Sequence, residues 1–380
     1  MKYRSFGKLD WKPSALGFGA MRFPILNSDN SQINEQASIQ LIRHAIDHGV
    51  NYIDSAYVYH GGNSETLVGK ALRDGYWEKV KVATKLPVWE VQTRQDMDRY
   101  FEEQLKRLQT NKIDFYLLHS LSKSSWPRIR DLGVFDWAEK KIAEGEIEYL
   151  GFSFHDEYPL FEEIVDSYPW TFCQIQYNYL DEDYQAGVKG LKYAASKGLG
   201  VIVMEPIAGG RLAVHPPEAI EKLWATSARK RSPADWALTW VWNQPEVSLL
   251  LSGMNTIQQI DENITTADKS CPNTLTHKEL ELIKNVAKKY KEISPIGCSG
   301  CRYCTPCPSN VAIPEIFSYY NQYFTKNGDD SVKKAFREAV KPEQWSENCT
   351  KCGRCEELCP QHLKIQELIA QAGILLQYER

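Results

Sequence analysis

Four side chains that can share acid–base chemistry occur in order between residues 54 and 119. Asp54, Lys85 and His119 each end a short apolar run, and Tyr59 follows Asp54 by five residues. A tyrosine, with a pKa of about 10, is a poor acid at neutral pH unless a nearby cation stabilises its phenolate. Lys85 could supply that cation, Asp54 could hold the lysine charged and in place, and His119 could hydrogen-bond a carbonyl oxygen. The set describes a general acid that protonates an alkoxide as hydride reaches carbon.

The elements that must position these residues follow from the surrounding pattern. From Ala15 to about Leu251, short β-rich runs alternate with helical patterns, and runs such as FYLLH and VIVM are continuously apolar, as in strands buried on both faces. The predicted strands are 15–20, 51–55, 80–85, 114–119, 147–153, 171–176, 200–205 and 247–251. This alternation predicts an α/β fold closed into a (β/α)₈ TIM barrel, whose catalytic groups gather at the carboxyl ends of strands. Residues 3–12 are predicted to form a hairpin that plugs the opposite end.

Each of the four polar residues has an ordinary explanation when it is taken alone. A lysine at a strand end is usually a solvated charge, and a tyrosine after a strand usually packs against its neighbours. A histidine after an apolar run can be buried and fully hydrogen-bonded. Their joint occurrence at successive strand ends is what favours catalysis.

Eight of the ten cysteines form two runs after residue 297, while Cys173 and Cys271 stand alone. The predicted metal ligands are Cys298, Cys301, Cys304, Cys307, Cys349, Cys352, Cys355 and Cys359, and a proline follows the last cysteine of each run. Thiolates at two-residue gaps can wrap one face of an iron–sulfur cubane. Zinc is the alternative, although zinc sites usually need two CxxC pairs rather than two runs of four. Cys173 is predicted to be a strand-core thiol and Cys271 a loop thiol.

The second run, C-x₂-C-x₂-C-x₃-C-P, is similar to the ligand run of bacterial ferredoxins. That resemblance implies two [4Fe-4S] clusters, with the fourth cysteine of each run bound to the other cluster. One cluster would use Cys298, Cys301, Cys304 and Cys359, and the other Cys349, Cys352, Cys355 and Cys307. The first run is one residue shorter than the standard spacing, and the insert at residues 313–345 contains helical patterns.

Length and composition fit two domains. A chain of 380 residues leaves roughly a hundred beyond a barrel of about 250. The predicted boundaries are 1–272 for the barrel, 273–292 for a helical linker and 293–380 for a small, largely helical ferredoxin-like iron–sulfur domain. The net charge of −4 gives no reason to expect nucleic acid, and neither a membrane helix nor a signal peptide is evident. The sequence therefore predicts a cytoplasmic protein without nucleic-acid or membrane partners.

The barrel motifs resemble those of the aldo-keto reductase superfamily. The run NYIDSAYVYHGGNSETLVGKAL is similar to the family signature, with Asp54 and Tyr59 at its catalytic positions. Lys85 in ATKLP and His119 in LLHS match the other two members of the family's tetrad. Together with the cysteine runs, nearly the whole chain resembles the ferredoxin-fused branch of that superfamily. The resemblance implies an NAD(P)-dependent oxidoreductase that acts on a small-molecule carbonyl or alcohol.

The same resemblance implies an extended nicotinamide dinucleotide at the barrel mouth, although the sequence carries no Rossmann fingerprint. The positions that match the family's cofactor contacts are Ser153, Gln174, Met204, Glu205, Ile207, Gly209, Arg211, Glu262 and Asn263. The family's Ser-Asn pair reads Ser153-Phe154 here, and Met204 replaces the aromatic residue that stacks on the nicotinamide.

The family's cations for the 2′-phosphate of NADP are replaced in this sequence. The lysine and arginine positions fall at Gly253 and Gln259, so the phosphate loses its charge-assisted partners there. The sequence is compatible with both NADP(H) and NAD(H), and the family resemblance favours NADP. Arg22 and Arg211 could supply positive charge nearby.

Three functions are compatible with these features. In the first, the barrel interconverts a carbonyl and an alcohol while two clusters exchange electrons, with an electron-transfer protein as a further partner. Hydride transfer moves two electrons at once, whereas an iron–sulfur cluster passes one at a time. A flavin could couple the two processes, but no flavin motif is evident. In the second, the clusters of an NAD(P)H-dependent reductase are structural or regulatory. In the third, the barrel is a nucleotide-sensing scaffold for an electron-transfer module, which the intact tetrad disfavours.

Overall fold

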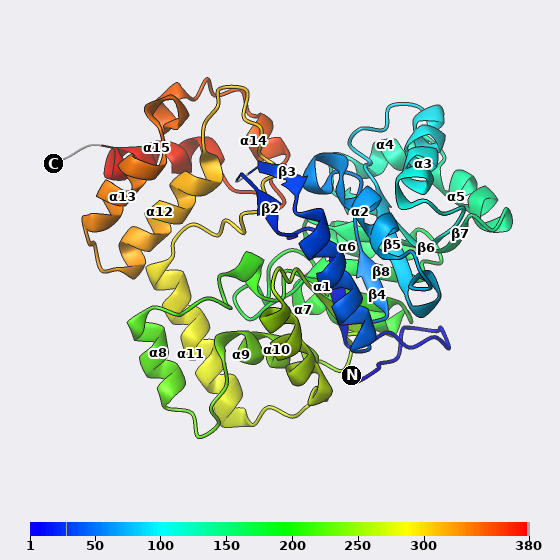
Figure 1. Cartoon of the computed structure of the whole chain (residues 1–380), viewed down its shortest axis with the longest axis horizontal. Helices are drawn as coiled ribbons and strands as arrows, with labels where there is room; N and C mark the ends of the chain where they lie inside the picture. The colour runs from blue at the N-terminus through cyan, green and yellow to red at the C-terminus, as the bar shows by residue number, and fades with distance from the viewer. Residues whose placement is uncertain (28, 378–380) are drawn as a thin grey trace. The chain divides into compact units, whose positions relative to one another are not determined.

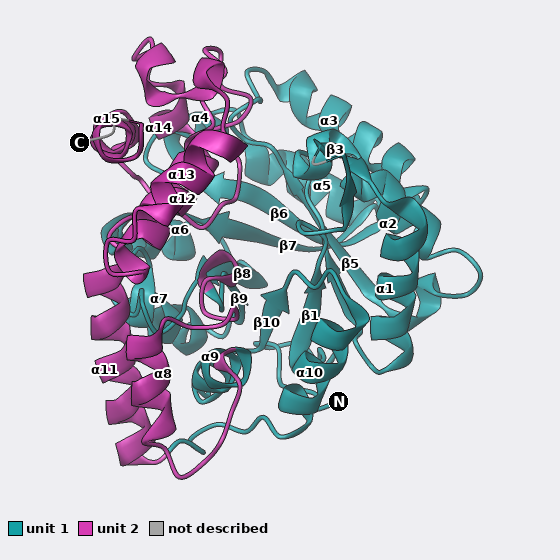
Figure 2. Cartoon of the chain, turned by 60° about the vertical axis from the view of Figure 1, so that its left-hand side comes forward, with its two compact units in different colours: residues 1–207, 234–275 teal, residues 208–233, 276–380 magenta. Residues whose placement is uncertain are grey.

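The computed structural model describes residues 1–27 and 29–377, and Figure 1 follows the chain by colour. Contacts within the chain group it into two compact units, which Figure 2 distinguishes. The first unit comprises Met1–Ile207 and Ala234–Leu275, and the second comprises Ala208–Pro233 and Thr276–Arg380. The predicted end of the barrel at residue 272 lies near the boundary at Leu275. Residues 208–233, which the sequence placed in the barrel domain, group with the second unit.

The first unit contains a closed barrel of parallel strands in the order β1-β10-β9-β8-β7-β6-β5-β4. Strand β1 closes the barrel, because it pairs with β10 through Leu16 and Leu250 and with β4 through Phe18 and Ile53. The strands are β1 (Leu16–Gly19), β4 (Tyr52–Asp54), β5 (Lys81–Leu86), β6 (Ile113–Leu121), β7 (Ile147–Phe154), β8 (Phe172–Gln176), β9 (Gly200–Met204) and β10 (Leu249–Ser252). Each overlaps one predicted strand, so the expected (β/α)₈ barrel is confirmed.

Helices alternate with these strands and surround them in Figure 2. Local signals in the sequence explain where they begin: Asn34 caps α1 by accepting from the Ala37 N–H, and Thr93 and Asp96 form a capping box at α3. The helices are α1 (Glu35–Asp47), α2 (Ser64–Ala71), α3 (Arg94–Leu108), α4 (Trp126–Asp131), α5 (Val134–Ala143), α6 (Tyr158–Asp166), α7 (Gly187–Ser196), α9 (Pro233–Trp242) and α10 (Ile257–Asp268), with short 3₁₀ helices η1 (Tyr59–Gly62) and η2 (Trp77–Lys79).

Two features at the ends of the barrel differ from a regular alternation. An antiparallel hairpin, β2 (Ile25–Leu26) and β3 (Asp29–Ile33), follows the first barrel strand and was not predicted. At the other end, residues 3–12 form isolated bridges rather than the regular strands of a hairpin. Phe6 from that segment is fully buried, with its ring 5.4 Å from Phe115 and 5.9 Å from Phe172, so the segment closes the amino-terminal end as expected.

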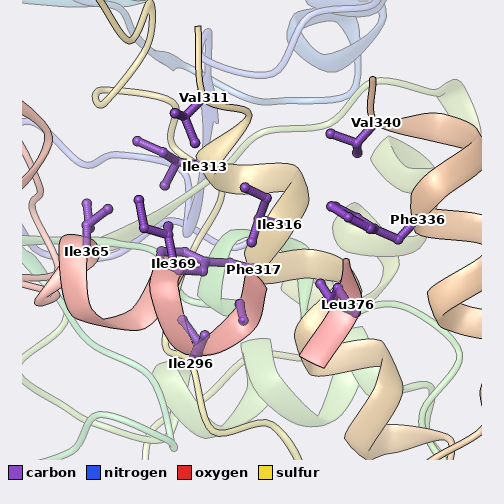
Figure 3. Close-up of a cluster of buried hydrophobic side chains, with 11 residues drawn as sticks. Ile296, Val311, Ile313, Ile316, Phe317, Phe336, Val340, Ile365, Ile369 and Leu376 are labelled. Atoms are coloured by element: carbon purple, nitrogen blue, oxygen red, sulfur yellow. The ribbon is translucent and has the colours of Figure 1, made fainter. Parts of the chain in front are cut away.

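The second unit is largely helical, as predicted for the cysteine domain. Its apolar core, drawn in Figure 3, includes Ile316, Phe317, Phe336 and Ile369. Its elements are η3 (Ala208–Gly210), α8 (Glu218–Ala225), α11 (His277–Ile293), α12 (Ile313–Thr325), α13 (Ser331–Ala339), η4 (Pro342–Gln344), η5 (Ser346–Asn348), α14 (Arg354–Glu357) and α15 (Ile365–Leu376). Across the described residues of both units, every helix is too short or too polar to cross a membrane.

Candidate active site and cysteine centres

A buried ion pair lies at the carboxyl ends of two neighbouring barrel strands. Asp54 is the last residue of β4, and Lys85 lies one residue before the end of β5. The Lys85 Nζ donates to Asp54 Oδ1 at 2.7 Å and to the Ser55 carbonyl at 2.6 Å, with the lysine side chain fully buried. Burial lowers the pKa of Lys85 and raises the pKa of Asp54, and the attraction between the two charges opposes both shifts.

The aromatic members of the predicted set lie around this pair. The Lys85 Nζ is 5.0 Å from the centroid of the Tyr59 ring, which η1 presents after β4. The Tyr59 and His119 rings are edge to face with centroids 6.2 Å apart, and the Trp89 ring lies 4.9 Å from that of His119. The structure therefore brings all four predicted catalytic residues together, beside an aromatic wall.

A bulge in β6 lies next to His119. Strand β6 has one extra residue opposite β7 between Leu118 and Leu121, and Ser120 there has a left-handed φ of 56°. The Ser120 N–H donates to the Ser153 Oγ at 2.7 Å. Sequence reasoning ended this strand at His119, but the strand continues to Leu121, because the bulge keeps the pairing with β7.

His119 is expected to make barrel stability depend on pH. Burial, and then the nearby charges of Lys85 and His155, lowers its pKa well below the ordinary value. The unfolded chain therefore binds more protons below about pH 6.5, and the free energy of unfolding should fall by up to about 1.4 kcal/mol per pH unit there. We expect urea denaturation of His119→Asn to show a weaker acid dependence than the unchanged protein. His215→Asn, at an exposed position, should leave the dependence unchanged; equal slopes for all three proteins would contradict the assignment.

The two cysteine runs share one backbone conformation. Gly300 and Lys351, each preceding the second cysteine of its run, have left-handed φ values of 65° and 56°. Their N–H groups donate to Cys298 Sγ and Cys349 Sγ, both at 3.4 Å. The residues that follow the second cysteines are left-handed as well. The same N–H to sulfur contact in both runs fits thiolate ligands, whose negative charge backbone donors stabilise.

The cysteines approach one another across the runs. Burial, followed by the neighbouring thiols of Cys301, Cys298 and Cys359, raises the pKa of Cys304. Cys355 is likewise close to Cys349 and Cys307, and with burial as the largest cause its pKa rises to about 11. A cavity is lined by Cys307, Cys349, Cys352 and Cys355, together with Cys304. In the described chain, no group of three or more acidic, histidine or cysteine side chains has an arrangement suited to holding a single metal ion.

The solitary cysteines occupy the predicted surroundings. Cys173 is fully buried in β8, where burial raises the pKa of its thiol, and Cys271 is exposed in a loop. Neither lies in one of the two runs.

Comparison with known proteins identifies both parts of the chain. The Aldo/keto reductase family model matches residues 15–288. The chain belongs to the aldo/keto reductase family. A model of the 4Fe-4S dicluster domain matches residues 297–364, so a ferredoxin-like iron–sulfur domain follows in the sequence.

Individual relatives of this aldo/keto reductase match most of its length. A probable aldo-keto reductase 1 of Glycine max is 27% identical over 292 residues, covering 68% of this chain and 82% of the relative. An uncharacterised oxidoreductase of Bacillus subtilis is 23% identical over 339 residues, covering 78% and 96%. The holo form of an aldo-keto reductase from Bacillus halodurans superposes with a TM-score of 0.63 and 25% identity, covering 75% and 96%.

The barrel of this aldo/keto reductase carries most of the residues predicted to contact a nucleotide. Gln174 in β8 is buried, and within the described chain its Oε1 has no hydrogen-bond partner, while its Nε2 lies 3.5 Å from the Met204 sulfur. Asn263 in α10 donates to Ser252 Oγ at 3.1 Å, beside Glu262 in the same helix. Glu205 and Ile207 follow β9. An unsatisfied buried amide oxygen suits a carboxamide N–H donor such as that of nicotinamide.

Gly209 and Arg211 group with the second unit instead. Arg211 donates from Nη2 to the Ser294 Oγ at 3.0 Å, and Gly209 has a left-handed φ of 67°. Their role in nucleotide binding stays a prediction from the family resemblance.

The stem of an arginine side chain lies beside the replaced lysine position of the aldo/keto reductase barrel. A Cβ atom on Gly253 would lie only 2.6 Å from the Cγ of Arg22. The Arg22 side chain therefore passes through the space that a side chain at position 253 would need. Gln259, at the second replaced position, accepts from the Asn255 N–H at 2.8 Å.

A polar network beneath the Tyr59 turn was missed in the sequence. Glu65, Thr84 and Gln104 are fully buried and hydrogen-bonded to one another. One signal was available: Gln104 lies on the same face of α3 as the buried Phe101 and Leu108, where an apolar residue is the usual choice.

Proposed function

We propose that the barrel catalyses hydride transfer between a nicotinamide dinucleotide and a small-molecule carbonyl or alcohol. The observation that carries the proposal is the fully buried Lys85, bonded to Asp54 and lying 5.0 Å from the Tyr59 ring centroid. A proton donor, a cation and a carboxylate in this order form an acid whose conjugate base is stabilised. A protein that only binds a nucleotide, without reducing a carbonyl, does not require a proton donor in this position.

Each residue of the set has a distinct part in carbonyl reduction. A reduced nicotinamide, when bound, would supply the hydride for the carbonyl carbon. Tyr59 gives its hydroxyl proton to the carbonyl oxygen. Lys85 stabilises the phenolate that remains, and Asp54 keeps the lysine charged in its buried position. His119 stays neutral, since burial lowers its pKa, and can donate a hydrogen bond to the substrate oxygen. Alcohol oxidation uses the same groups in reverse.

Anaerobic turnover tests this proposal. Oxidation of NADPH or NADH that requires an added aldehyde or ketone, and yields the alcohol in equal amount, supports it. Nucleotide oxidation that is independent of every carbonyl compound in a panel of aliphatic, aromatic and sugar carbonyls contradicts it.

We further propose that the barrel prefers NADP(H), with Arg22 as the partner of the 2′-phosphate. The support is the position of Arg22 across Gly253, where the family places a lysine. Arg22→Gln should weaken NADPH binding by about tenfold to a hundredfold, the equivalent of one charge-assisted hydrogen bond, and leave NADH binding unchanged. Fluorescence titration measures both dissociation constants, and Arg73→Gln, an exposed arginine that bonds Gln109, is the control. An equal effect on both nucleotides would overturn the preference.

We also propose that the second unit holds two [4Fe-4S] clusters with crossed ligands. The proximity of Cys359 to Cys304 and of Cys307 to Cys355 supports this pairing. When bound, such clusters supply one-electron transfer. Cys352 is exposed, so the second set of ligands lies where an electron-transfer protein could approach.

A further inference from the structure

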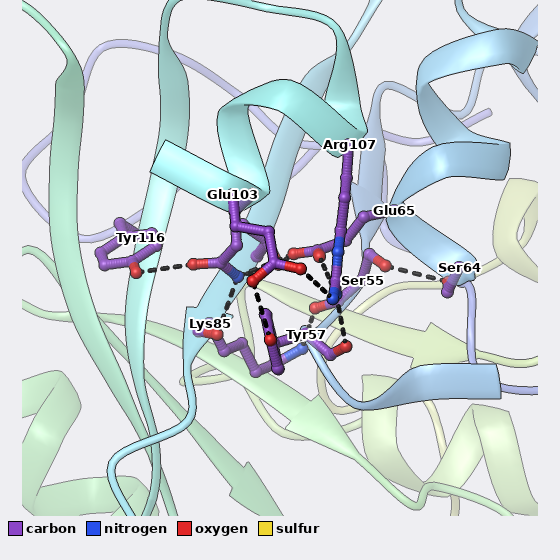
Figure 4. A network of polar contacts seen from close by, with 10 residues as sticks. Ser55, Tyr57, Ser64, Glu65, Lys85, Glu103, Arg107 and Tyr116 are labelled. Atoms are coloured by element: carbon purple, nitrogen blue, oxygen red, sulfur yellow. Dashed lines mark hydrogen bonds and ion pairs between the residues drawn. The ribbon is translucent and has the colours of Figure 1, made fainter. Parts of the chain in front are cut away.

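A partly buried ion pair joins helices α2 and α3 close to Lys85 (Figure 4). Arg107 in α3 donates from Nη1 to Glu65 Oε2 at 3.2 Å and from Nη2 to Glu103 Oε1 at 2.7 Å. The Glu65 side chain in α2 is fully buried, and burial raises its pKa against the opposing bonds from Thr84, Gln104 and Arg107. Neither Arg107 nor Glu65 belongs to the set of four residues assigned to the reaction.

Arg107 bonds the start of the turn that carries Tyr59 and lies close to its end. At the start of the turn, its Nη1 donates to the Tyr57 carbonyl at 3.0 Å, and its guanidinium lies 4.1 Å from the centroid of the Tyr57 ring. At the end of the turn, Gly62 has a left-handed φ of 93°, and a Cβ there would lie 3.3 Å from both terminal nitrogens of Arg107. Glu103 completes the arrangement by accepting from the Tyr57 hydroxyl at 2.9 Å.

Glu65 contacts the strand that carries Lys85. Its Oε1 accepts from Thr84 Oγ1 at 2.5 Å and from Gln104 Nε2 at 2.7 Å. Gln104 Nε2 also lies 3.0 Å from the Lys85 carbonyl, and its Oε1 accepts from the Tyr116 hydroxyl at 2.7 Å. The backbone of β5 at Lys85 is thus tied, through two side chains, to the carboxylate that pairs with Arg107.

We propose that the Glu65–Arg107 pair positions Tyr59 over Lys85. The inference rests on the function proposed for these two residues. Arg107 fixes the turn that presents Tyr59, and Glu65 fixes the strand that presents Lys85. An ion pair with one buried partner is a weak source of stability compared with apolar packing, but its fixed geometry can specify one arrangement. The reaction rate depends strongly on the distance between a general acid and the cation that stabilises it, so a fixed geometry can raise that rate.

Arg107→Lys tests the positioning role. Lysine keeps the positive charge but lacks the planar fork that reaches the Tyr57 carbonyl and two carboxylates at once. We expect kcat for carbonyl reduction to fall by about tenfold to a hundredfold, as for a small misplacement of a reacting group. The dissociation constant of NADPH and the KM of the carbonyl should stay unchanged, and the primary deuterium isotope effect on kcat should increase because chemistry becomes slower.

Arg99→Lys is the matched control. Arg99 lies in the same helix, bonds Asp96 at 2.7 Å and lies 4.4 Å from the Tyr100 ring centroid, so these contacts stay within α3. If Arg107→Lys retains the kcat and isotope effect of Arg99→Lys, the positioning role is overturned. If circular dichroism shows that Arg107→Lys does not fold, Glu103→Gln is used instead. Glu103 is partly exposed, and its substitution weakens the ion pair that orients Arg107. Glu103→Gln should then lower kcat with nucleotide binding intact, and an unchanged kcat overturns the proposal.

Tyr59→Phe, measured in parallel, separates this inference from the function on which it rests. Full activity of Tyr59→Phe would refute the proposed function itself. Loss of activity in Tyr59→Phe, together with normal activity in Arg107→Lys, would refute the positioning role alone.

Discussion

Replacing Tyr59 with phenylalanine will lower the rate of carbonyl reduction by about a hundredfold to ten-thousandfold, the usual contribution of a general acid. Phenylalanine retains the ring, so the edge-to-face contact with His119 and the position beside Lys85 are kept. Only the hydroxyl that supplies the proton is lost. Nucleotide affinity and thermal stability should therefore stay close to those of the unchanged protein.

The control for this substitution is Tyr76→Phe. Tyr76 also has a lysine nitrogen beside its ring, with Lys79 Nζ 4.3 Å from the centroid, and its hydroxyl donates to Asp47 at 2.8 Å. It lies at the surface near η2, so its substitution should leave turnover unchanged. Steady-state kinetics with NADPH and a reducible aldehyde measure both variants. Similar rates for Tyr59→Phe and Tyr76→Phe would show that the proton comes from another group.

The second large effect is expected from Cys359→Ser. This substitution should remove one cluster and leave the other. Iron content should fall from about eight to about four atoms per chain, since each [4Fe-4S] cluster accounts for half. The side chains of Cys304 and Cys359 belong to different runs yet lie close enough to affect each other's charge. Chemical iron analysis of anaerobically reconstituted protein gives the number directly.

Double substitutions decide whether the ligands are crossed. With crossed ligands, Cys298 and Cys359 serve one cluster, so the Cys298→Ser/Cys359→Ser protein should keep about four iron atoms. The Cys349→Ser/Cys359→Ser protein should lose both clusters. The opposite pattern would mean that each run binds its own cluster, and iron-free reconstituted protein with zinc bound would support the zinc alternative.

The same proteins reveal what the clusters do. If dithionite and NADPH both produce the electron paramagnetic resonance signal of a reduced cluster, barrel and clusters form one electron path. If only dithionite does so, and the cluster-deficient variants reduce carbonyls at the normal rate, the clusters are structural, regulatory or directed to a protein partner.

The barrel strands and the proximity of the four candidate residues could be predicted because each depends on a local pattern. Buried parallel strands require continuous apolar runs, and Asp54, Lys85 and His119 lie at or near the carboxyl ends of the strands that such runs define. The hairpin β2–β3 escaped prediction because its strands are short and largely exposed, so no alternation of buried and exposed residues marks them.

Contacts between residues distant in sequence could not be predicted in this way. Arg107 lies 50 positions from Tyr57, and Arg22 lies more than two hundred positions from Gly253. Each contact depends on how helices and loops pack around the closed barrel. The crossed proximity of the cysteines was predictable only because the second run matches a known ligand spacing.

Transfer of deuterium from NADPH labelled at the nicotinamide C4 position to a carbonyl carbon is the measurement that tests the central claim most directly. The claim predicts that mass spectrometry will find one deuterium at the carbinol carbon of the product alcohol, with label transfer strongly reduced in Tyr59→Phe and normal in Tyr76→Phe. Product alcohol without deuterium, or equal label transfer in the two variants, would contradict hydride transfer assisted by this tyrosine.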